Sequence, residues 1–367
     1  MKKVVICGGG IIGASTAYYL SVLDISKTLD ITVIERETIA CHSSGKAGGF
    51  LALDWHNSKT EPLAKLSYSL HEELSRTLNA DTGYRNVSSF SIDSRASKSS
   101  KVKKKSTDSW IDGNILQKDT IGTTKTTSQV HPFILTNELM NFAMTNGAKL
   151  KKGVVIGVDK DENNDISHIN LSDGSHLEAD VVVISMGAWS FQAADYFPLC
   201  KNAFQVEGQK AHSVILEANV PAEALFIHHI DDSGQSLKSH EPEIYPRPDG
   251  TVYVCGEGDE SILPEDPSLI TPSPNSCEKL QELAASVSSH LKGAKLLHKQ
   301  ACYIPCSPDG IPIIGKLPFY KEAYVGTGHG VWGILNGPAT GKCLAQVILD
   351  IKPDIDLTLF SPNRFLT

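Results

Sequence analysis

The sequence lacks any apolar stretch that approaches the ~18 residues needed to cross a bilayer. It also lacks an excess of positive charge, since 34 Lys and Arg residues face 42 Asp and Glu residues, which argues against general binding of nucleic acid. The first predicted strand begins at residue 2 and leaves no room for a signal peptide before it. We therefore expect a cytoplasmic protein with no nucleic-acid partner and no transmembrane segment, while a peripheral membrane contact stays open.

The eight cysteines follow no pairing pattern and are scattered along the chain. Cys302 and Cys306 have no second cysteine or histidine pair at zinc-site spacing, so we expect no metal. Isolated thiols are typical of the reducing cytosol. At 367 residues, 41% of them hydrophobic, the chain exceeds what one core usually supports. Two structural units are therefore expected.

The first 35 residues predict a strand, a glycine turn, a helix and a second strand. The β-branched run at 2–7 is followed by G-G-G-I-I-G at 8–13 and by an apolar helical stretch. The next β-branched run, 31–34, ends in Glu35, which lies roughly 20 positions after Gly13, as expected of the ribose-binding acid in a dinucleotide fold. A glycine-rich turn in another kind of α/β protein is the alternative.

The glycines have separate roles in such a site. Gly8 allows the tight turn, Gly10 lets the backbone approach a pyrophosphate, and Gly13 lets the helix pack closely. The phosphates would then lie at the positive end of the helix. Glu35 would bind a ribose diol and repel a 2′-phosphate, which favours FAD or NAD over NADP.

Three later segments predict further cofactor contacts. The small-residue loop at 41–50 offers the Ser43 and Ser44 hydroxyls and the Lys46 ammonium to a phosphate, with a flexible surface turn as the alternative. A buried strand at 179–184 leads into S-M-G-A-W-S at 185–190. The segment 323–341 again predicts a strand, glycines and a helix, whose N-terminus would stabilise the negative charge of a reduced flavin. The third segment therefore favours FAD over NAD.

The middle of the chain has a different pattern. From about 200 to 295, strand-like pieces alternate with proline-rich turns and predict an antiparallel sheet in a second unit. The serine-rich stretch that includes K-V-K-K-K at 101–105 predicts an exposed insertion near 94–108. This basic run is either a solvated loop or a contact for nuclear import or an acidic membrane.

Taken together and in this order, the motifs resemble the FAD-dependent D-amino acid oxidase superfamily, which includes glycine oxidase and sarcosine oxidase. Within it, S-S-G-K-A-G-G-F at 43–50 is most similar to a fungal and plant group of oxidoreductases. The resemblance rests on the following segments: G-x-G-x-x-G at 8–13 with Glu35, A-G-G at 47–49, S-M-G-A-W-S at 185–190, Y-P-R-x-x-G at 245–250, S-P-D-G-x-P-I-I-G at 307–315 and G-H-G-x-x-G at 328–333.

The resemblance implies an α/β fold in which a Rossmann-type FAD-binding domain is interleaved with a substrate domain of mixed, largely antiparallel sheet. The FAD-binding domain would comprise 1–82, 130–200 and 296–367, and the substrate domain 83–129 and 201–295. The implied chemistry is oxidation of a small amine or amino acid by hydride transfer to flavin N5. The imine is then hydrolysed, and oxygen or another acceptor reoxidises the flavin.

The residues that the resemblance and the motifs assign to FAD lie in four parts of the chain. They are Gly8, Gly10, Ile11, Ile12, Gly13, Glu35, Arg36, Ser43, Ser44, Lys46, Ala47, Gly48, Gly49, Val155, Ser185, Gly187, Trp189, Gly328, His329, Gly330, Val331 and Gly333.

The sequence departs from the family at the substrate anchor. Glycine oxidase and D-amino acid oxidase carry an arginine before the proline that matches Pro305, and this arginine pairs with the substrate carboxylate; here the residue is Ile304. Any replacement would come from the side chains Arg247, His229 or Lys210.

Four residues are the catalytic candidates: Glu243, Tyr245, His329 and Trp332. Glu243 and Tyr245 share one face of a predicted strand. The resemblance implies that this face looks at the flavin, so Glu243 would bind a cationic amine. A salt-bridged surface glutamate is its alternative, a loop-locking hydrogen bond is that of His329, and core packing is that of Trp332. Cys302 matches the position at which sarcosine oxidase joins its flavin by a thioether, with a buried unreactive thiol as the alternative.

Two rival functions stay open, and loss of the family arginine at Ile304 supports the first. One is an FAD-binding protein with a regulatory or trafficking role and little oxidase activity. The other is a dehydrogenase that passes electrons to a quinone or carrier.

Overall fold

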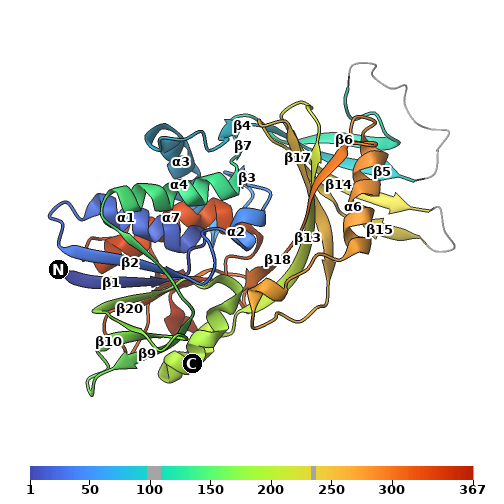
Figure 1. Ribbon diagram of the computed structural model, residues 1–367. Coiled ribbons are helices and arrows are strands. Elements are labelled where there is room, and N and C mark those ends of the chain that lie inside the picture. Colours follow the sequence, from blue (N-terminus) through green and yellow to red (C-terminus); the bar gives the residue numbers. More distant parts are fainter. Residues whose placement is uncertain (97–108, 233–236, 367) are drawn as a thin grey trace.

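The computed structural model describes residues 1–96, 109–232 and 237–366, which form two large sheets joined side by side (Figure 1). In the first sheet, neighbouring strands are parallel except for the antiparallel pair β19–β20. The strand order is β19 (Ile313–Lys316), β20 (Ala323–Thr327), β12 (Val181–Ile184), β1 (Lys2–Cys7), β2 (Leu29–Glu35) and β8 (Lys149–Lys152).

The side chains of β1 alternate between two hydrophobic cores, as expected of a strand covered on both faces. Val4 and Ile6 pack with the helices α1 (Ile11–Leu23), α3 (Glu61–Thr77), α4 (Pro132–Thr145) and α7 (Gly333–Ile348), which lie on one face of the sheet (Figure 1). Val5 and Cys7 pack against the other core. That core includes the small sheet of β9 (Val155–Lys160), β10 (Ile166–Leu171) and β11 (His176–Glu178), and α5 (Ala193–Tyr196).

The second large sheet is mainly antiparallel, with one parallel pair between β14 and β5. Its order is β18 (Lys295–Cys306), β13 (Glu207–Glu217), β17 (Thr251–Asp259), β16 (Glu243–Pro246), β14 (Glu223–Asp231), β5 (Ser88–Arg95) and β6 (Ile115–Gly122), with β15 (Lys238–His240) paired to β14. Helix α6 (Pro274–Val287) covers one face of this sheet. The opposite face carries Tyr245 and Tyr253 and looks toward a small sheet of β3 (Phe50–Ala52), β7 (Thr127–Gln129) and β4 (Arg85–Asn86).

The predicted fold class is confirmed: a parallel Rossmann-type sheet and a large mixed sheet alternate along the chain. The predicted domain boundaries stay a prediction. Strand β18 falls almost wholly within the predicted FAD segment 296–367 but pairs with β13 in the second sheet. The predicted exposed insertion near 94–108 does not include 94 and 95, because β5 extends to Arg95 and Ser94 is buried. The basic run at 101–105 lies outside the described residues.

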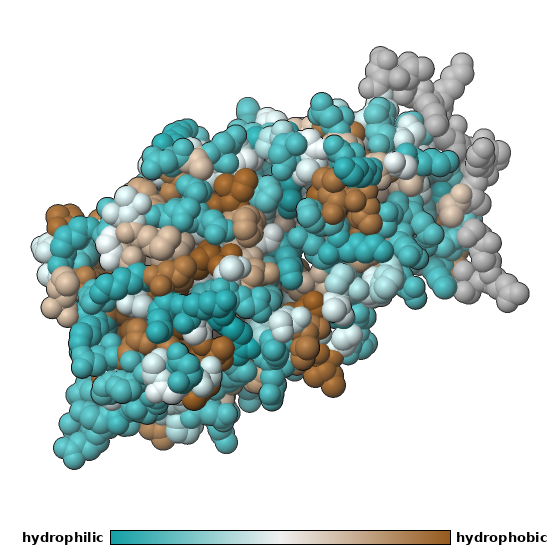
Figure 2. All heavy atoms as spheres, viewed as in Figure 1, coloured by the Kyte–Doolittle hydropathy of each residue, from teal (hydrophilic) through white to brown (hydrophobic). Residues whose placement is uncertain are grey.

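On the face of the molecule drawn in Figure 2, hydrophobic residues form separate patches among hydrophilic ones. Most large apolar side chains lie instead in the cores between the layers. Within the described part of the chain, no helix has both the length and the apolar character to cross a membrane.

Candidate active site

A cavity of about 840 Å³ lies where the carboxyl ends of the parallel strands meet the open face of the second sheet. Gly8 follows β1, Glu35 ends β2 and Ser185 follows β12, and all three line this cavity. The second sheet contributes Glu243 and Tyr253 from the opposite side. Cofactors bind at this edge of open α/β sheets, and the volume is within the range of ligand sites.

The geometry of the glycine turn separates the three predicted roles. Gly8 has φ +110°, and a Cβ there would lie 2.4 Å from the carbonyl oxygen of Ser185. A Cβ on Gly13 would lie 1.9 Å from the carbonyl oxygen of Gly8, so the helix packs directly on the turn. Gly10 lines the cavity, and its Cβ would meet only the Ser44 hydroxyl, at 3.0 Å. The turn thus leaves backbone free of side chains where a pyrophosphate would approach.

Glu35 connects the end of β2 to this turn. Its Oε2 accepts a hydrogen bond from the Gly9 N–H at 2.7 Å, and its Oε1 accepts one from the Glu37 N–H at 2.9 Å. A carboxylate has about four acceptor sites, so capacity remains for a ribose hydroxyl. Beside it, Arg36 donates to the carbonyl of Glu265 at 2.8 Å.

The predicted phosphate loop is partly the short helix α2 (Ser43–Lys46). The Ser44 hydroxyl accepts a hydrogen bond from the Ile11 N–H at 2.9 Å. The Ser43 hydroxyl donates to the carbonyl of Tyr303 at 2.6 Å, and Lys46 Nζ donates to that of Ala301 at 3.1 Å. Ser43 and Lys46 therefore connect the first unit to strand β18 of the second sheet. The polar atoms of all three side chains have hydrogen-bond partners in the protein.

The cavity brings together nearly all the residues predicted to hold FAD. Only Gly13 and Gly328 of that set do not line it. Gly328 instead has φ +72° and turns tightly against Ser307. Those that line it are Gly8, Gly10, Ile11, Ile12, Glu35, Arg36, Ser43, Ser44, Lys46, Ala47, Gly48, Gly49, Val155, Ser185, Gly187, Trp189, His329, Gly330, Val331 and Gly333.

Helix α7 begins at Gly333, on the cavity wall, so its N-terminal dipole lies beside the space a flavin would fill. His329, just before it, is buried, and burial lowers the pKa of its imidazole to about 3. Its Nε2 lies 2.9 Å from the hydroxyl of Thr340 on α7. The ring is therefore neutral and makes the loop-locking hydrogen bond that was its alternative, although His329 also lines the cavity.

Glu243 and Tyr245 point from β16 into the cavity, as the strand alternation predicted. The Tyr245 hydroxyl donates to Glu243 Oε2 at 2.7 Å, and the Cys255 thiol lies 3.5 Å from the same oxygen. Burial raises the pKa of Tyr245 well above its usual value, so the phenol keeps its proton. The hydrogen bonds to the carboxylate thus both go to Oε2.

Aromatic rings that sequence analysis did not single out lie beside Tyr245, the hydrogen-bond partner of this carboxylate. Phe50, Trp55 and Phe226 have ring centroids 4.8 to 5.0 Å apart, and Phe226 lies 5.8 Å from Tyr245. The signal was strand register: Phe226 is paired with Glu243 on the neighbouring strand. Trp332, half-buried, also lines the cavity. These rings come from distant parts of the chain.

The three candidate replacements for the family arginine lie in different places. Arg247 is buried outside the cavity wall and donates to the carbonyl of Ala47 at 3.1 Å. His229 lies outside it too, 2.9 Å from the Ser94 hydroxyl. Lys210 does line the cavity, paired with Asp259 at 3.3 Å. Among the described residues, Arg36 beside Glu35 is the only arginine on the wall.

Cys302 is buried on the cavity wall, on strand β18. Burial raises the pKa of its thiol to about 11. A raised pKa lowers the fraction of thiolate at neutral pH. The position of Cys302 permits contact with a flavin, and the thioether link stays a prediction.

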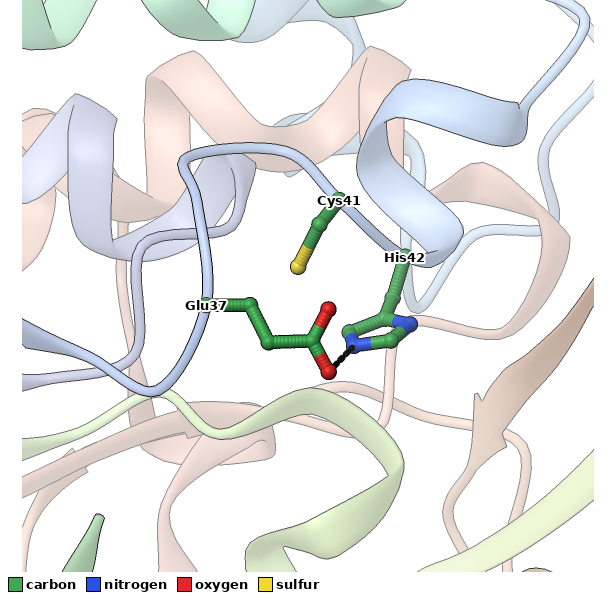
Figure 3. A group of neighbouring side chains, drawn as sticks. All are labelled: Glu37, Cys41 and His42. Carbon is green, nitrogen blue, oxygen red and sulfur yellow. Dashed lines mark ion pairs between the residues drawn. The ribbon is translucent and has the colours of Figure 1, made fainter. Parts of the chain in front are cut away.

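Figure 3 shows Glu37, Cys41 and His42, whose ligand atoms lie within 4.8 Å of one another. His42 Nε2 is 3.9 Å from Glu37 Oε1, and burial lowers the pKa of His42 to about 4, so its ring is neutral. Both ring nitrogens are buried without a hydrogen-bond partner among the described residues. Because Cys41 and His42 line the cavity near Glu35, the ring can bond a ligand there.

Comparisons with known proteins agree with this geometry. The family model described as FAD dependent oxidoreductase matches residues 3–347. A Schizosaccharomyces pombe protein named provisionally as an oxidoreductase, C1F5.03c, is 32% identical over 95% of this chain and 94% of its own length. TDA3 of Saccharomyces cerevisiae, named in the same way, is 26% identical over 95% and 92%. A glycine oxidase structure from Bacillus cereus matches with a TM-score of 0.78 and 21% identity over 100% of this chain and 99% of that one.

Proposed function

This chain belongs to the FAD-dependent oxidoreductase family, and on that premise we propose that it oxidises a small amine or amino acid at the C–H bond next to nitrogen. The observation that carries the proposal is the Glu243–Tyr245 pair, which places an anionic acceptor on the wall of the predicted cofactor cavity. We place the activity in the cytoplasm, in keeping with eight free cysteines.

The residues present fit FAD. The side-chain-free turn from Gly8 to Gly10 would take the pyrophosphate, Glu35 the ribose, and the start of α7 at Gly333 the flavin ring. When bound, FAD would accept a hydride, and with it two electrons, from the substrate, and oxygen or another acceptor would then remove the two electrons.

The protein's own residues do the binding and proton chemistry. Glu243 accepts a proton from the substrate aminium, because only the neutral amine can lose hydride to give an imine, which water hydrolyses. Tyr245 donates to Glu243 Oε2 and so keeps the carboxylate in one orientation. The aromatic rings of Phe226 and Trp332 exclude water from this end of the cavity.

Anaerobic mixing with a panel of amines and amino acids tests the proposal. A substrate should bleach the flavin absorption near about 450 nm. If purified yellow protein is bleached by no member of a broad panel, the proposed oxidation is wrong. Slow reaction of the reduced protein with oxygen would identify a dehydrogenase that serves another acceptor.

The second candidate is an FAD-binding protein with a regulatory or trafficking role. Its support is Ile304, which lines the cavity where the family arginine would stand. In that case FAD binds and the protein stays yellow, yet no amine produces peroxide in steady state.

A further inference from the structure

We propose that the substrate is an apolar amine that carries no carboxylate, bound through its aminium group at Glu243 and through its carbon skeleton on the aromatic rings of Phe50, Trp55 and Phe226. These three rings are called the aromatic wall below. The inference rests on the proposed function, and it reverses the charge preference expected where an arginine anchors an amino acid.

The first argument is the charge of the cavity on the side of the second sheet. Glu241, Glu243 and Glu257 all line it there, and Glu257 Oε1 lies 2.9 Å from His240 Nδ1. The one lysine of that sheet on the wall, Lys210, is paired with Asp259. A substrate carboxylate would therefore enter beside carboxylates and lose its hydration without gaining a guanidinium partner.

The second argument is that the other cations near the cavity each donate a hydrogen bond to a backbone carbonyl. Lys46 Nζ donates to the carbonyl of Ala301, and Arg247 lies outside the wall and binds the carbonyl of Ala47. Arg36 stands at the Glu35 end of the cavity and donates to Glu265. No described guanidinium therefore reaches the place that Ile304 occupies.

The third argument is the free side of Glu243. Its Oε2 receives the Tyr245 hydroxyl at 2.7 Å and the Cys255 thiol at 3.5 Å. Its Oε1 accepts no hydrogen bond from the described residues, and the side chain faces the cavity. An aminium group donates up to three hydrogen bonds and is the natural complement of this oxygen.

The fourth argument is the apolar surface that lines the same cavity as Glu243. Phe226 pairs with Glu243 in the strand register, and its ring lies 4.8 Å from Trp55 and 5.0 Å from Phe50. Ile304 adds an aliphatic face on β18. Aromatic faces also attract cations, so the aromatic wall favours an organic aminium on both counts.

The test compares two ligands with the same skeleton, benzylamine and phenylglycine, the second as both enantiomers. Anaerobic flavin bleaching gives the reduction rate and its half-saturating concentration, and calorimetry on the oxidised holoprotein gives binding alone. We expect benzylamine to bind at least about tenfold more tightly than phenylglycine, because the added carboxylate loses its hydration beside like charges.

Two variants locate the effect. Glu243→Gln should weaken benzylamine binding about tenfold or more, whereas the control Glu61→Gln, which removes an exposed carboxylate paired with Lys65, should not change it. Ile304→Arg should reverse the preference toward phenylglycine by restoring a guanidinium. Retained flavin absorbance shows that each variant is folded; where Glu243→Gln is not, Glu243→Ala takes its place.

The outcomes separate this inference from the proposed function. If phenylglycine binds as tightly as benzylamine or more tightly, the inference is overturned, and the proposed function still stands if phenylglycine or another amine reduces the flavin. If benzylamine binds in a Glu243-dependent way but no amine reduces the flavin, the inference stands and the proposed function falls. If neither ligand binds, or if Glu243→Gln binds benzylamine as wild type does, the inference is overturned.

Discussion

Substitution of Gly10 by alanine separates the role of the glycine turn in cofactor binding from its role in folding. Gly10 has φ −76°, an ordinary value for alanine, and the added Cβ would meet only the Ser44 hydroxyl, at 3.0 Å. The unfolding free energy of the apoprotein should therefore change by less than about 1 kcal/mol. Alanine lowers the conformational entropy of the unfolded chain, which offsets part of any loss of stability.

Binding of FAD should respond quite differently. The methyl group stands on the cavity wall, where a phosphate oxygen would approach the backbone. Loss of a single hydrogen bond to a charged oxygen costs about 1.5–3 kcal/mol, so the dissociation constant should rise by roughly 10- to 150-fold. By contrast, Gly13→Ala forces a Cβ to within 1.9 Å of the Gly8 carbonyl and should impair both folding and binding.

The assay pairs quenching of FAD fluorescence on reconstitution with urea unfolding of the apoprotein. Gly157→Ala is the matched control, because its Cβ would meet Asn170 at an ordinary 3.4 Å and Gly157 does not line the cavity. Wild-type FAD affinity in Gly10→Ala would refute the reasoning, and so would a large fall in its urea midpoint without a change in affinity.

Three further predictions concern the buried side chains of Cys302, His71 and Arg247. Acid precipitation should release FAD into the supernatant, since the pKa of the buried Cys302 thiol is raised to about 11; a yellow pellet would show a covalent link. His71 is buried with its pKa lowered to about 4, and its Nε2–H donates to the carbonyls of Ile334 and Leu335. As the pH falls, His71 is protonated in the unfolded chain before it is protonated in the folded one. The free energy of unfolding should therefore show no contribution from His71 above about pH 6.5 and fall by up to about 3 kcal/mol toward pH 4. Urea titrations at several pH values should show a slope smaller by one proton in His71→Gln, and an unchanged slope would contradict this assignment. Arg247→Met, which releases the carbonyl of Ala47, should weaken FAD binding several-fold; unchanged affinity on reconstitution would show that this contact does not position the loop.

The cofactor end of the site was readable from the sequence because its requirements are local. Gly8 and Gly13 are needed for a turn and a helix contact within six residues of each other, and Glu35 lies at a fixed distance along one β-α-β unit. The family resemblance built on such segments is confirmed by the family match. The predicted phosphate contacts of Ser43 and Lys46 have no such local cause. These contacts stay a prediction, and the polar atoms of both side chains bond the carbonyls of β18, about 260 residues away, which only the fold brings near.

The sequence by itself determined the Rossmann-type unit, because hydrophobic periodicity and glycine spacing act between near neighbours in the chain. The family resemblance of its motifs added FAD as the cofactor and the departure at Ile304. Only the tertiary structure decided what surrounds Glu243. The aromatic wall comes from β3, the segment after it and β14, and its position depends on which strands pair and in which register. Strand register is set by long-range packing. The charge and shape of the cavity around Glu243 therefore depend on how the two sheets are placed on either side of it.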